Sequence, residues 1–135
     1  MPFILLVEDD YQLREMLHTI LTSSGYVVWE APNGKTANRL CQQRKPDLVI
    51  TDLIMPNKDG FELISDLRRK DPTVKIVVIS GGGEKIPAEC HLRMARKLGV
   101  QHTLSKPFGP AEFLETVRLA LEAGNQSANP NLKAA

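Results

Sequence analysis

The chain has 135 residues, enough for one domain with a single hydrophobic core and too few for two ordinary domains. Its 17 lysines and arginines nearly balance 16 aspartates and glutamates, and the formal charge of +1 does not indicate a protein that binds nucleic acid. No apolar segment approaches the roughly 20 residues needed to cross a bilayer, and the N-terminus lacks the features of a leader, so we expect a cytoplasmic protein without a membrane partner.

Apolar runs of strand length alternate with segments of helical periodicity. Residues 3–7 form the first such run, and apolar side chains then recur every three or four positions until Gly25, which suits a helix end. A second strand is predicted at residues 26–29. Asn33 suits the N-cap of the next helix, which stops before Pro46.

The second half of the chain repeats this pattern. Further strands are predicted at residues 48–51, 74–79 and 102–104. Asp59 and Glu62 have the spacing of a capping box at the start of the third helix. A glycine-rich segment leads to a helix near residues 88–98, which Gly99 closes, and the last helix begins near Pro110.

Five strands alternating with five helices predict an α/β domain with a parallel sheet, because each crossover helix must cover a face of the sheet. We expect this domain to occupy residues 1–123. Residues 124–135 are polar and aperiodic, which predicts a disordered tail. In such sheets, ligands bind outside the carboxyl ends of the strands.

Polar side chains follow four of the five predicted strands, whereas the exit of the second strand, "EAPNG", offers only turn residues. The polar groups are Glu8, Asp9 and Asp10 after the first strand, Asp52 after the third, Ser80 after the fourth and Lys106 after the fifth. Each has an ordinary alternative, since acids cap helices, serine forms turns and lysine is commonly solvated. Clustered acids at a sheet edge, however, repel one another unless a cation neutralises them.

The chemistry of this set favours a phosphate site. Carboxylates without nearby thiolate or imidazole suit a hard cation, and a sparse set of protein ligands suits Mg²⁺. A lysine and a hydroxyl can bind the remaining phosphoryl oxygens. A carboxylate facing that pocket can act as a nucleophile towards phosphorus and form an acyl phosphate.

The motifs "ILLVEDD", "DLVITDLIMPNKDG", "VVIS" and "SKPF", in this order, resemble the receiver domain of bacterial two-component response regulators. The resemblance covers residues 3–123 and implies the chemotaxis-Y-like fold, a flavodoxin-like, doubly wound (βα)5 domain with strand order 2-1-3-4-5. The chain resembles a stand-alone receiver, since no output domain follows residue 123.

The resemblance also implies a role for each matching residue. Asp52 is the phosphoacceptor and a Mg²⁺ ligand, Asp9 a direct ligand, Glu8 a ligand through water, Ile54 a ligand through its carbonyl, Ser80 the switch hydroxyl and Lys106 the phosphoryl contact. Asp10 remains a helix cap, and the Lys106-Pro107 bond is expected to be cis.

The implied function is a phosphorylation-dependent switch. A sensor histidine kinase or a phosphotransfer protein donates the phosphoryl group to Asp52, and the chain, though not an enzyme in the ordinary sense, catalyses its own phosphorylation and dephosphorylation. An unknown downstream protein reads the result by contact. One alternative is a phosphate sink or phosphorelay intermediate without conformational output. A more distant one is a small flavin- or nucleotide-binding domain of similar topology.

The sequence departs from the family pattern in two places. Thr103 occupies a position where many receivers have Tyr or Phe. The sequence therefore does not support a switch that works by moving an aromatic side chain at this position. The segment from Ser80 to Lys106 is longer than usual, with the excess in "GGGEKIPAE". Gly81 within it should leave the pocket open. We expect the contact face to include the fourth helix, where Arg93, Arg96 and Lys97 add positive charge.

Overall fold

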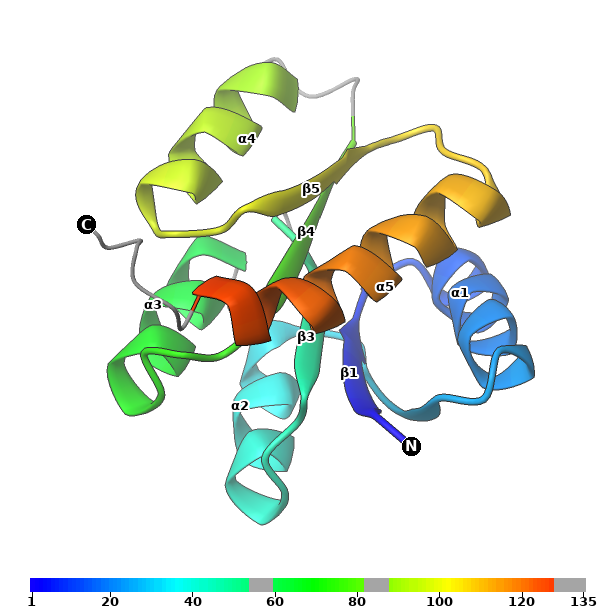
Figure 1. Ribbon diagram of the computed structural model, residues 1–135, viewed down its shortest axis with the longest axis horizontal. Coiled ribbons are helices and arrows are strands. Elements are labelled where there is room, and N and C mark those ends of the chain that lie inside the picture. The colour runs from blue at the N-terminus through cyan, green and yellow to red at the C-terminus, as the bar shows by residue number, and fades with distance from the viewer. Residues whose placement is uncertain (54–59, 82–87, 128–135) are drawn as a thin grey trace.

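A five-stranded parallel sheet forms the centre of the computed structural model, which describes residues 1–53, 60–81 and 88–127 (Figure 1). The strand order is β2-β1-β3-β4-β5. The strands are β1 (Phe3–Val7), β2 (Val27–Ala31), β3 (Leu48–Asp52), β4 (Ile76–Ser80) and β5 (His102–Ser105). The helices are α1 (Tyr11–Ser23), α2 (Gly34–Gln43), α3 (Gly60–Lys70), α4 (Ala88–Lys97) and α5 (Pro110–Ser127). The predicted fold class and strand order are confirmed.

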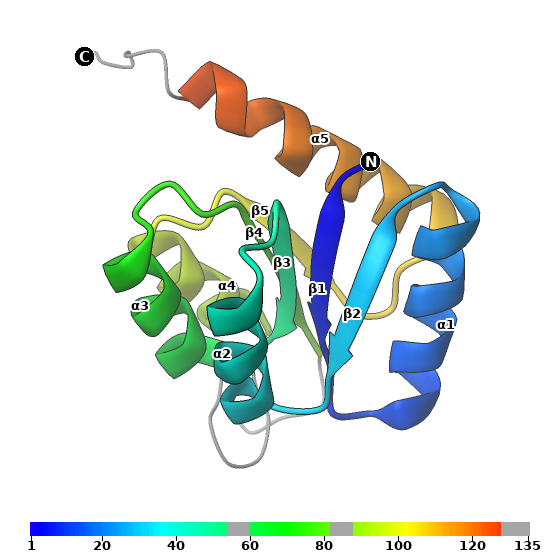
Figure 2. The ribbon, with the colours of Figure 1, turned by 90° about the horizontal axis from the view of Figure 1, so that it is seen from below.

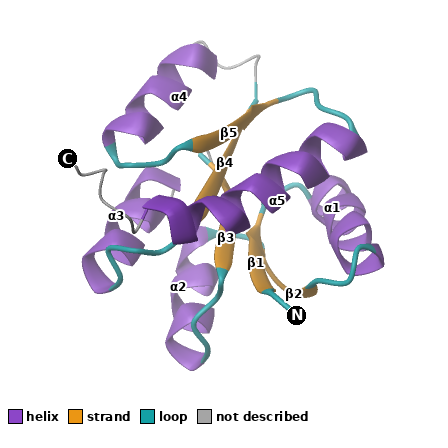
Figure 3. Cartoon of the chain, in the orientation of Figure 1, coloured by secondary structure: helices purple, strands orange, loops and turns teal. Residues whose placement is uncertain are grey.

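Two layers of helices enclose the sheet. Figures 2 and 3 show α1 and α5 on one face and α2, α3 and α4 on the other. Successive side chains of β1 alternate between the two resulting cores, because side chains of a strand point to opposite faces in turn. Ile4 and Leu6 pack with α1 and α5, whereas Leu5 and Val7 pack with the other three helices. This explains why all five residues of β1 are buried.

Capping residues and glycines in the sequence predicted several helix ends correctly. Asp10 caps α1, since its Oδ1 accepts hydrogen bonds from the amides of Gln12 and Leu13 at 3.0 and 3.2 Å. Asn33 caps α2 by accepting a bond from the Thr36 amide at 2.8 Å. Gly25 and Gly99 follow α1 and α4 with φ of 97° and 86°, a conformation that disfavours other residues.

Several boundaries differ from the sequence analysis. The second strand spans Val27–Ala31 rather than residues 26–29, and the fourth spans Ile76–Ser80 rather than 74–79. Helix α5 continues through Gly124 to Ser127, so the first part of the predicted disordered tail is helical. Asp59, the predicted cap of α3, lies outside the described residues.

The topology brings particular strand ends together. β1 and β3 are adjacent, but α1 follows β1 on one face and α3 follows β3 on the other. The connections therefore diverge at this point, and in sheets of this kind ligands bind outside the carboxyl ends of the strands where the connections diverge. Among the residues described, no helix is both long and apolar enough to cross a membrane.

Candidate functional site

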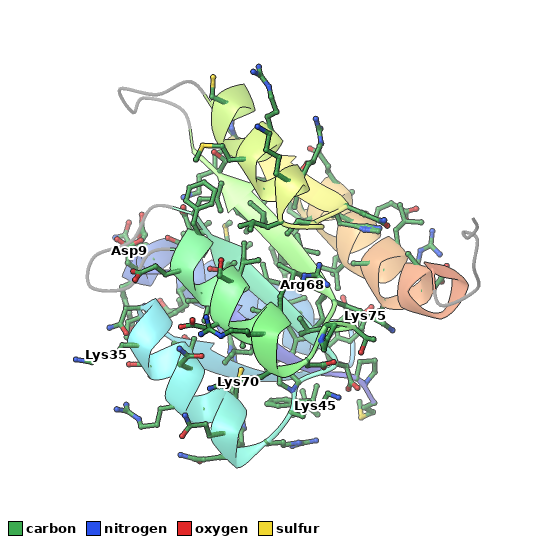
Figure 4. All side chains as sticks on the ribbon, turned by 90° about the vertical axis from the view of Figure 1, so that its left-hand side faces the viewer. Asp9, Lys35, Lys45, Arg68, Lys70 and Lys75 are labelled. Carbon is green, nitrogen blue, oxygen red and sulfur yellow. The ribbon has the colours of Figure 1, made fainter. Side chains whose placement is uncertain are left out.

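Three carboxylates meet at the carboxyl ends of β1 and β3. Glu8 and Asp9 directly follow β1, and Asp52 is the last residue of β3. One carboxylate oxygen from each residue lies within 4.8 Å of the others. Glu8 and Asp52 are buried, whereas Asp9 is exposed at the rim, where Figure 4 labels it at the edge opposite Lys75. The predicted acidic cluster is thus assembled.

Lys106 enters the same site from the end of β5. Its Nζ lies 2.8 Å from Oδ2 of Asp52 and 3.7 Å from Oε1 of Glu8. Burial alone lowers the pKa of Lys106, but the hydrogen bond from its ammonium to Asp52 and the negative charges of Asp52, Glu8 and Asp9 outweigh burial and raise the pKa. Lys106 is therefore charged and bound to the acids. The peptide bond that follows it is cis, as the family resemblance implied.

Glu8 is the buried acid that Lys106 contacts less closely, at 3.7 Å compared with 2.8 Å for Asp52. Its side chain is 1% exposed, its Oε2 accepts a hydrogen bond from the Asp10 amide at 3.1 Å, and its Oε1 accepts none from any described residue. Burial, followed by the charge of Asp52, raises the pKa of Glu8 to about 8. A buried acceptor beside two further acids is the kind of atom that a cation would satisfy.

The donor set fits Mg²⁺. All three candidate ligands offer carboxylate oxygen, the donor that hard divalent cations prefer, and Mg²⁺ retains waters at a site with few protein ligands. The exposed position of Asp9 leaves one side of the cluster open to solvent. Ile54, whose carbonyl was predicted as a further ligand, lies outside the described residues.

Ser80 ends β4, beside this cluster. It is 1% exposed, and its strand neighbour in register is Ser105 of β5. The carbonyl of Ser80 accepts a hydrogen bond from the Lys106 amide at 2.8 Å, so the two predicted phosphate-binding residues are joined through the backbone. A Cβ at Gly81 would lie 3.3 Å from Cδ of Lys106. Glycine therefore leaves the lysine side chain room to reach Asp52.

Gly60 allows α3 to pack against the backbone of Asp52 and Leu53. It begins α3, and its amide donates a hydrogen bond to the Leu53 carbonyl at 2.8 Å. A Cβ at this position would collide with the backbone carbonyl of Asp52 and lie 2.7 Å from Cα of Leu53. The helix can pack this closely against the end of β3 only because residue 60 is glycine.

Two residues next to the site, Arg14 and Glu30, were not among the predicted site residues. Arg14 donates a hydrogen bond from Nη1 to the backbone carbonyl of Glu8 at 2.7 Å, and its Nε contacts Glu30 at 3.0 Å. The exit of β2 was expected to offer only turn residues, but Glu30 supplies this charge. The available signal was the arginine four residues after the capping Asp10, in the first turn of α1.

Features away from the site have structural explanations. A cavity of about 250 Å³ at the amino ends of β4 and β5 is lined in part by Arg68 and Lys75. Both side chains bind backbone carbonyls, Arg68 those of Pro72 and Gly99, and Lys75 that of Leu121. These cations tie α3, β4 and α5 together. Both cysteines, Cys41 and Cys90, are free.

Comparisons with known proteins agree with this geometry. Residues 4–118 match the sequence model of the family described as "Response regulator receiver domain". The chain is 35% identical over 115 residues to "Chemotaxis protein CheY" of Thermotoga maritima, an alignment covering 84% of this chain and 92% of that protein. A crystal structure described as a putative response regulator from Chloroflexus aurantiacus is 28% identical with a TM-score of 0.81, covering 90% of this chain and 98% of the other.

Other relatives are longer. The chain is 36% identical over 131 residues to "KDP operon transcriptional regulatory protein KdpE" of Escherichia coli, covering 97% of this chain but 56% of that protein. It spans about half the length of several further curated relatives, including 47% of "Probable transcriptional regulator ycf27" of Guillardia theta.

The chain belongs to the response regulator receiver domain family. Membership places it in two-component systems, where receiver domains act in phosphorylation-dependent signalling with histidine kinases or phosphotransfer proteins as partners. Receiver domains bind Mg²⁺, and the acidic cluster lies where such an ion is expected.

The contact at residue 60 generates a stability prediction. Gly60→Ala should lower the free energy of unfolding by roughly 1–3 kcal/mol, because the added methyl group forces α3 away from the backbone of Asp52 and Leu53. Gly109→Ala is the matched control, since a Cβ there meets nothing within 4 Å. Urea unfolding of both variants measures the difference. Equal stabilities would contradict the close packing.

The environment of Glu8 generates a pH prediction for the metal-free protein. The native state binds the Glu8 proton more tightly than the unfolded chain, whose glutamate pKa is about 4.5, so this group's contribution to stability is lost as pH rises through about 8. The free energy of unfolding in EDTA should fall by about 2 kcal/mol or more between pH 5 and 8.5. Glu8→Gln should flatten this decline, whereas exposed Glu15→Gln should retain it. An identical decline in Glu8→Gln would show that another group causes it.

Proposed function

We propose that the chain is a phosphorylation-dependent switch that accepts a phosphoryl group on Asp52 from the phosphohistidine of a sensor histidine kinase or phosphotransfer protein. The observation that carries this proposal is the convergence of Glu8, Asp9, Asp52 and Lys106 at one edge of the sheet. This set contains a nucleophile, a cation and candidate metal ligands at the carboxyl ends of neighbouring strands.

Asp52 acts as the nucleophile. One of its carboxylate oxygens attacks phosphorus, the bond between phosphorus and the histidine nitrogen breaks, and that nitrogen leaves with the electron pair. The product is an acyl phosphate on Asp52. Oδ2 of Asp52 is hydrogen-bonded to Lys106, which orients the carboxylate before transfer. Lys106 can then pair with a phosphoryl oxygen as charge builds there.

Glu8, Asp9, Asp52 and the carbonyl of Ile54 would hold Mg²⁺, with Glu8 acting through water. When bound, the ion neutralises charge on the phosphoryl oxygens. Glu8 keeps its orientation through the bond from the Asp10 amide, and Asp9 lies at the solvent-exposed rim. The same residues serve dephosphorylation, in which water attacks phosphorus and regenerates the carboxylate.

The conformational change that follows phosphorylation is proposed to begin at Ser80. Its hydroxyl would bind a phosphoryl oxygen, and its movement would reach β5 through the bond between the Ser80 carbonyl and the Lys106 amide. Arg93, Arg96 and Lys97 are exposed on α4, the helix between these strands, and this face would contact an unknown downstream protein.

A phosphate sink or phosphorelay intermediate is the second candidate, and Thr103 favours it. This residue is half-buried in β5, in register with Val78. A threonine side chain displaces less volume on moving inward than the aromatic ring found in many receivers.

A flavin- or nucleotide-binding role is less well supported, because the acids after β1 would repel a ligand's phosphate.

Phosphorylation on Asp52 can be tested with a small phosphodonor. Incubation with acetyl phosphate and Mg²⁺ should give one phosphate-sized adduct by intact mass spectrometry. Asp52→Asn should abolish the adduct because an amide is not a nucleophile of this kind. Exposed Asp10→Asn, which retains a capping oxygen, is the control and should still be phosphorylated. An undiminished adduct on Asp52→Asn would contradict the assignment.

Switch and sink predict different responses to a phosphoryl mimic. If the chain is a switch, beryllofluoride with Mg²⁺ should change amide hydrogen exchange in α4 and β5 by at least several-fold at some positions. The amides of β2, at the far side of the sheet, should not change and serve as the internal reference. Unchanged exchange throughout residues 88–105, with the mimic bound, would favour the sink.

A further inference from the structure

Arg14 has the position and the contacts to fix the backbone of the acidic pair. It lies in the first turn of α1, where helical side chains point back towards the N-terminus of the helix. Its Nη1 reaches the backbone carbonyl of Glu8 at 2.7 Å. The Arg14 side chain is 14% exposed, so this contact is largely shielded from water.

The contact completes the restraints on Glu8. The Glu8 amide donates to the Ala31 carbonyl at 3.0 Å, which ties it to β2, and its Oε2 accepts from the Asp10 amide at 3.1 Å. With Arg14 on the carbonyl, Oε1 is the single oxygen of Glu8 without a hydrogen bond from any described residue. That oxygen faces Lys106, 3.7 Å away. The restraints therefore point one buried carboxylate oxygen into the site.

Glu30 supplies the opposing charge for Arg14. It is paired in register with Leu6, whose side chain belongs to the core beneath α1, so Glu30 faces α1 as well. Its Oε1 lies 3.0 Å from Nε of Arg14, and its Oε2 lies 2.8 Å from Nδ1 of His18. Because Glu30 balances the guanidinium charge, Arg14 can bind beside the acidic cluster with little repulsion of an incoming cation.

We infer that Arg14, held by Glu30, is a positioning residue that presents Glu8 and Asp9 to the divalent cation. This inference rests on the proposed Mg²⁺ site and deepens it. In this role Arg14 would bind neither the phosphoryl group nor the ion. It acts through the backbone of Glu8, in the way that residues behind the direct ligands orient metal sites in general.

Mg²⁺ titration by isothermal calorimetry tests the inference. Arg14→Gln should raise the Mg²⁺ dissociation constant about 10-fold or more. Arg14→Lys should have a smaller effect, because lysine keeps the charge and one donor but lacks the fork that reaches both Glu8 and Glu30. Arg118→Gln is the matched control: Arg118 also pairs with glutamates, Glu115 and Glu122, but on the exposed surface of α5, and its loss should leave the dissociation constant unchanged.

A double-mutant cycle separates positioning from general electrostatics. Glu30→Gln alone should weaken Mg²⁺ binding, since it leaves the charge of Arg14 unbalanced. In the Arg14→Gln background the same change should have little further effect, so that the double variant binds like Arg14→Gln alone. Independent effects, multiplying in the double variant, would contradict the coupling of the two residues.

A second measurement needs no metal. In EDTA, the Asp10 amide should exchange with solvent several-fold faster in Arg14→Gln than in the wild-type protein, while the Thr36 amide at the cap of α2 should be unchanged.

If the wild-type chain fails to bind Mg²⁺, the proposed metal site is wrong, and Asp10 exchange alone decides the role of Arg14. If the wild-type chain binds Mg²⁺ and Arg14→Gln matches it in affinity and exchange, the inference is overturned while the proposed function stands. Should Arg14→Gln not fold, Arg14→Lys replaces it in each comparison, with smaller changes in affinity and exchange expected.

Discussion

The mutual repulsion of three carboxylates at one sheet edge is the constraint on which the rest of the site depends. Glu8 and Asp52 are buried beside Asp9, and Lys106 is the cation that reaches both buried acids among the residues described. Burial, followed by the charge of Asp52, raises the pKa of Glu8 to about 8, and one ammonium does not balance three acids. Such an arrangement costs stability in the metal-free protein, but it provides a site for a cation and, with it, for phosphate.

The strands and helices of the fold hold each side chain of the site in position. Parallel pairing of β1 with β3 places the two buried acids side by side, and β4 and β5 bring Ser80 and Lys106 to the same edge. The packed helices then hold the strand ends. Gly60 allows α3 to contact the backbone of Asp52, and Arg14 connects α1 to the carbonyl of Glu8. The rigidity of the site thus comes from the helices of both layers.

The features that could be predicted from the sequence are those that depend on a local residue pattern or on which residues follow each strand. Asp10 and Asn33 cap helices through bonds to residues two or three positions away, and the cluster of Glu8, Asp9, Asp52 and Lys106 follows from the rule for parallel sheets. The pairing of Arg14 with Glu30 was not predictable, because it depends on the register of β2 against β1. The helical end of α5 was missed because the residues from 124 onward are polar and do not continue the apolar periodicity of the helix.

The central claim is that Asp52, rather than a neighbouring acid, forms the covalent bond to phosphorus. Borohydride reduces an acyl phosphate and converts the phosphorylated aspartate to homoserine, so peptide mass spectrometry after reduction locates the modified residue. The account predicts homoserine at position 52 alone, and only when both phosphodonor and Mg²⁺ were present. Homoserine at position 9 or 10, or none at position 52 under conditions where the intact protein carries a phosphoryl group, would contradict it.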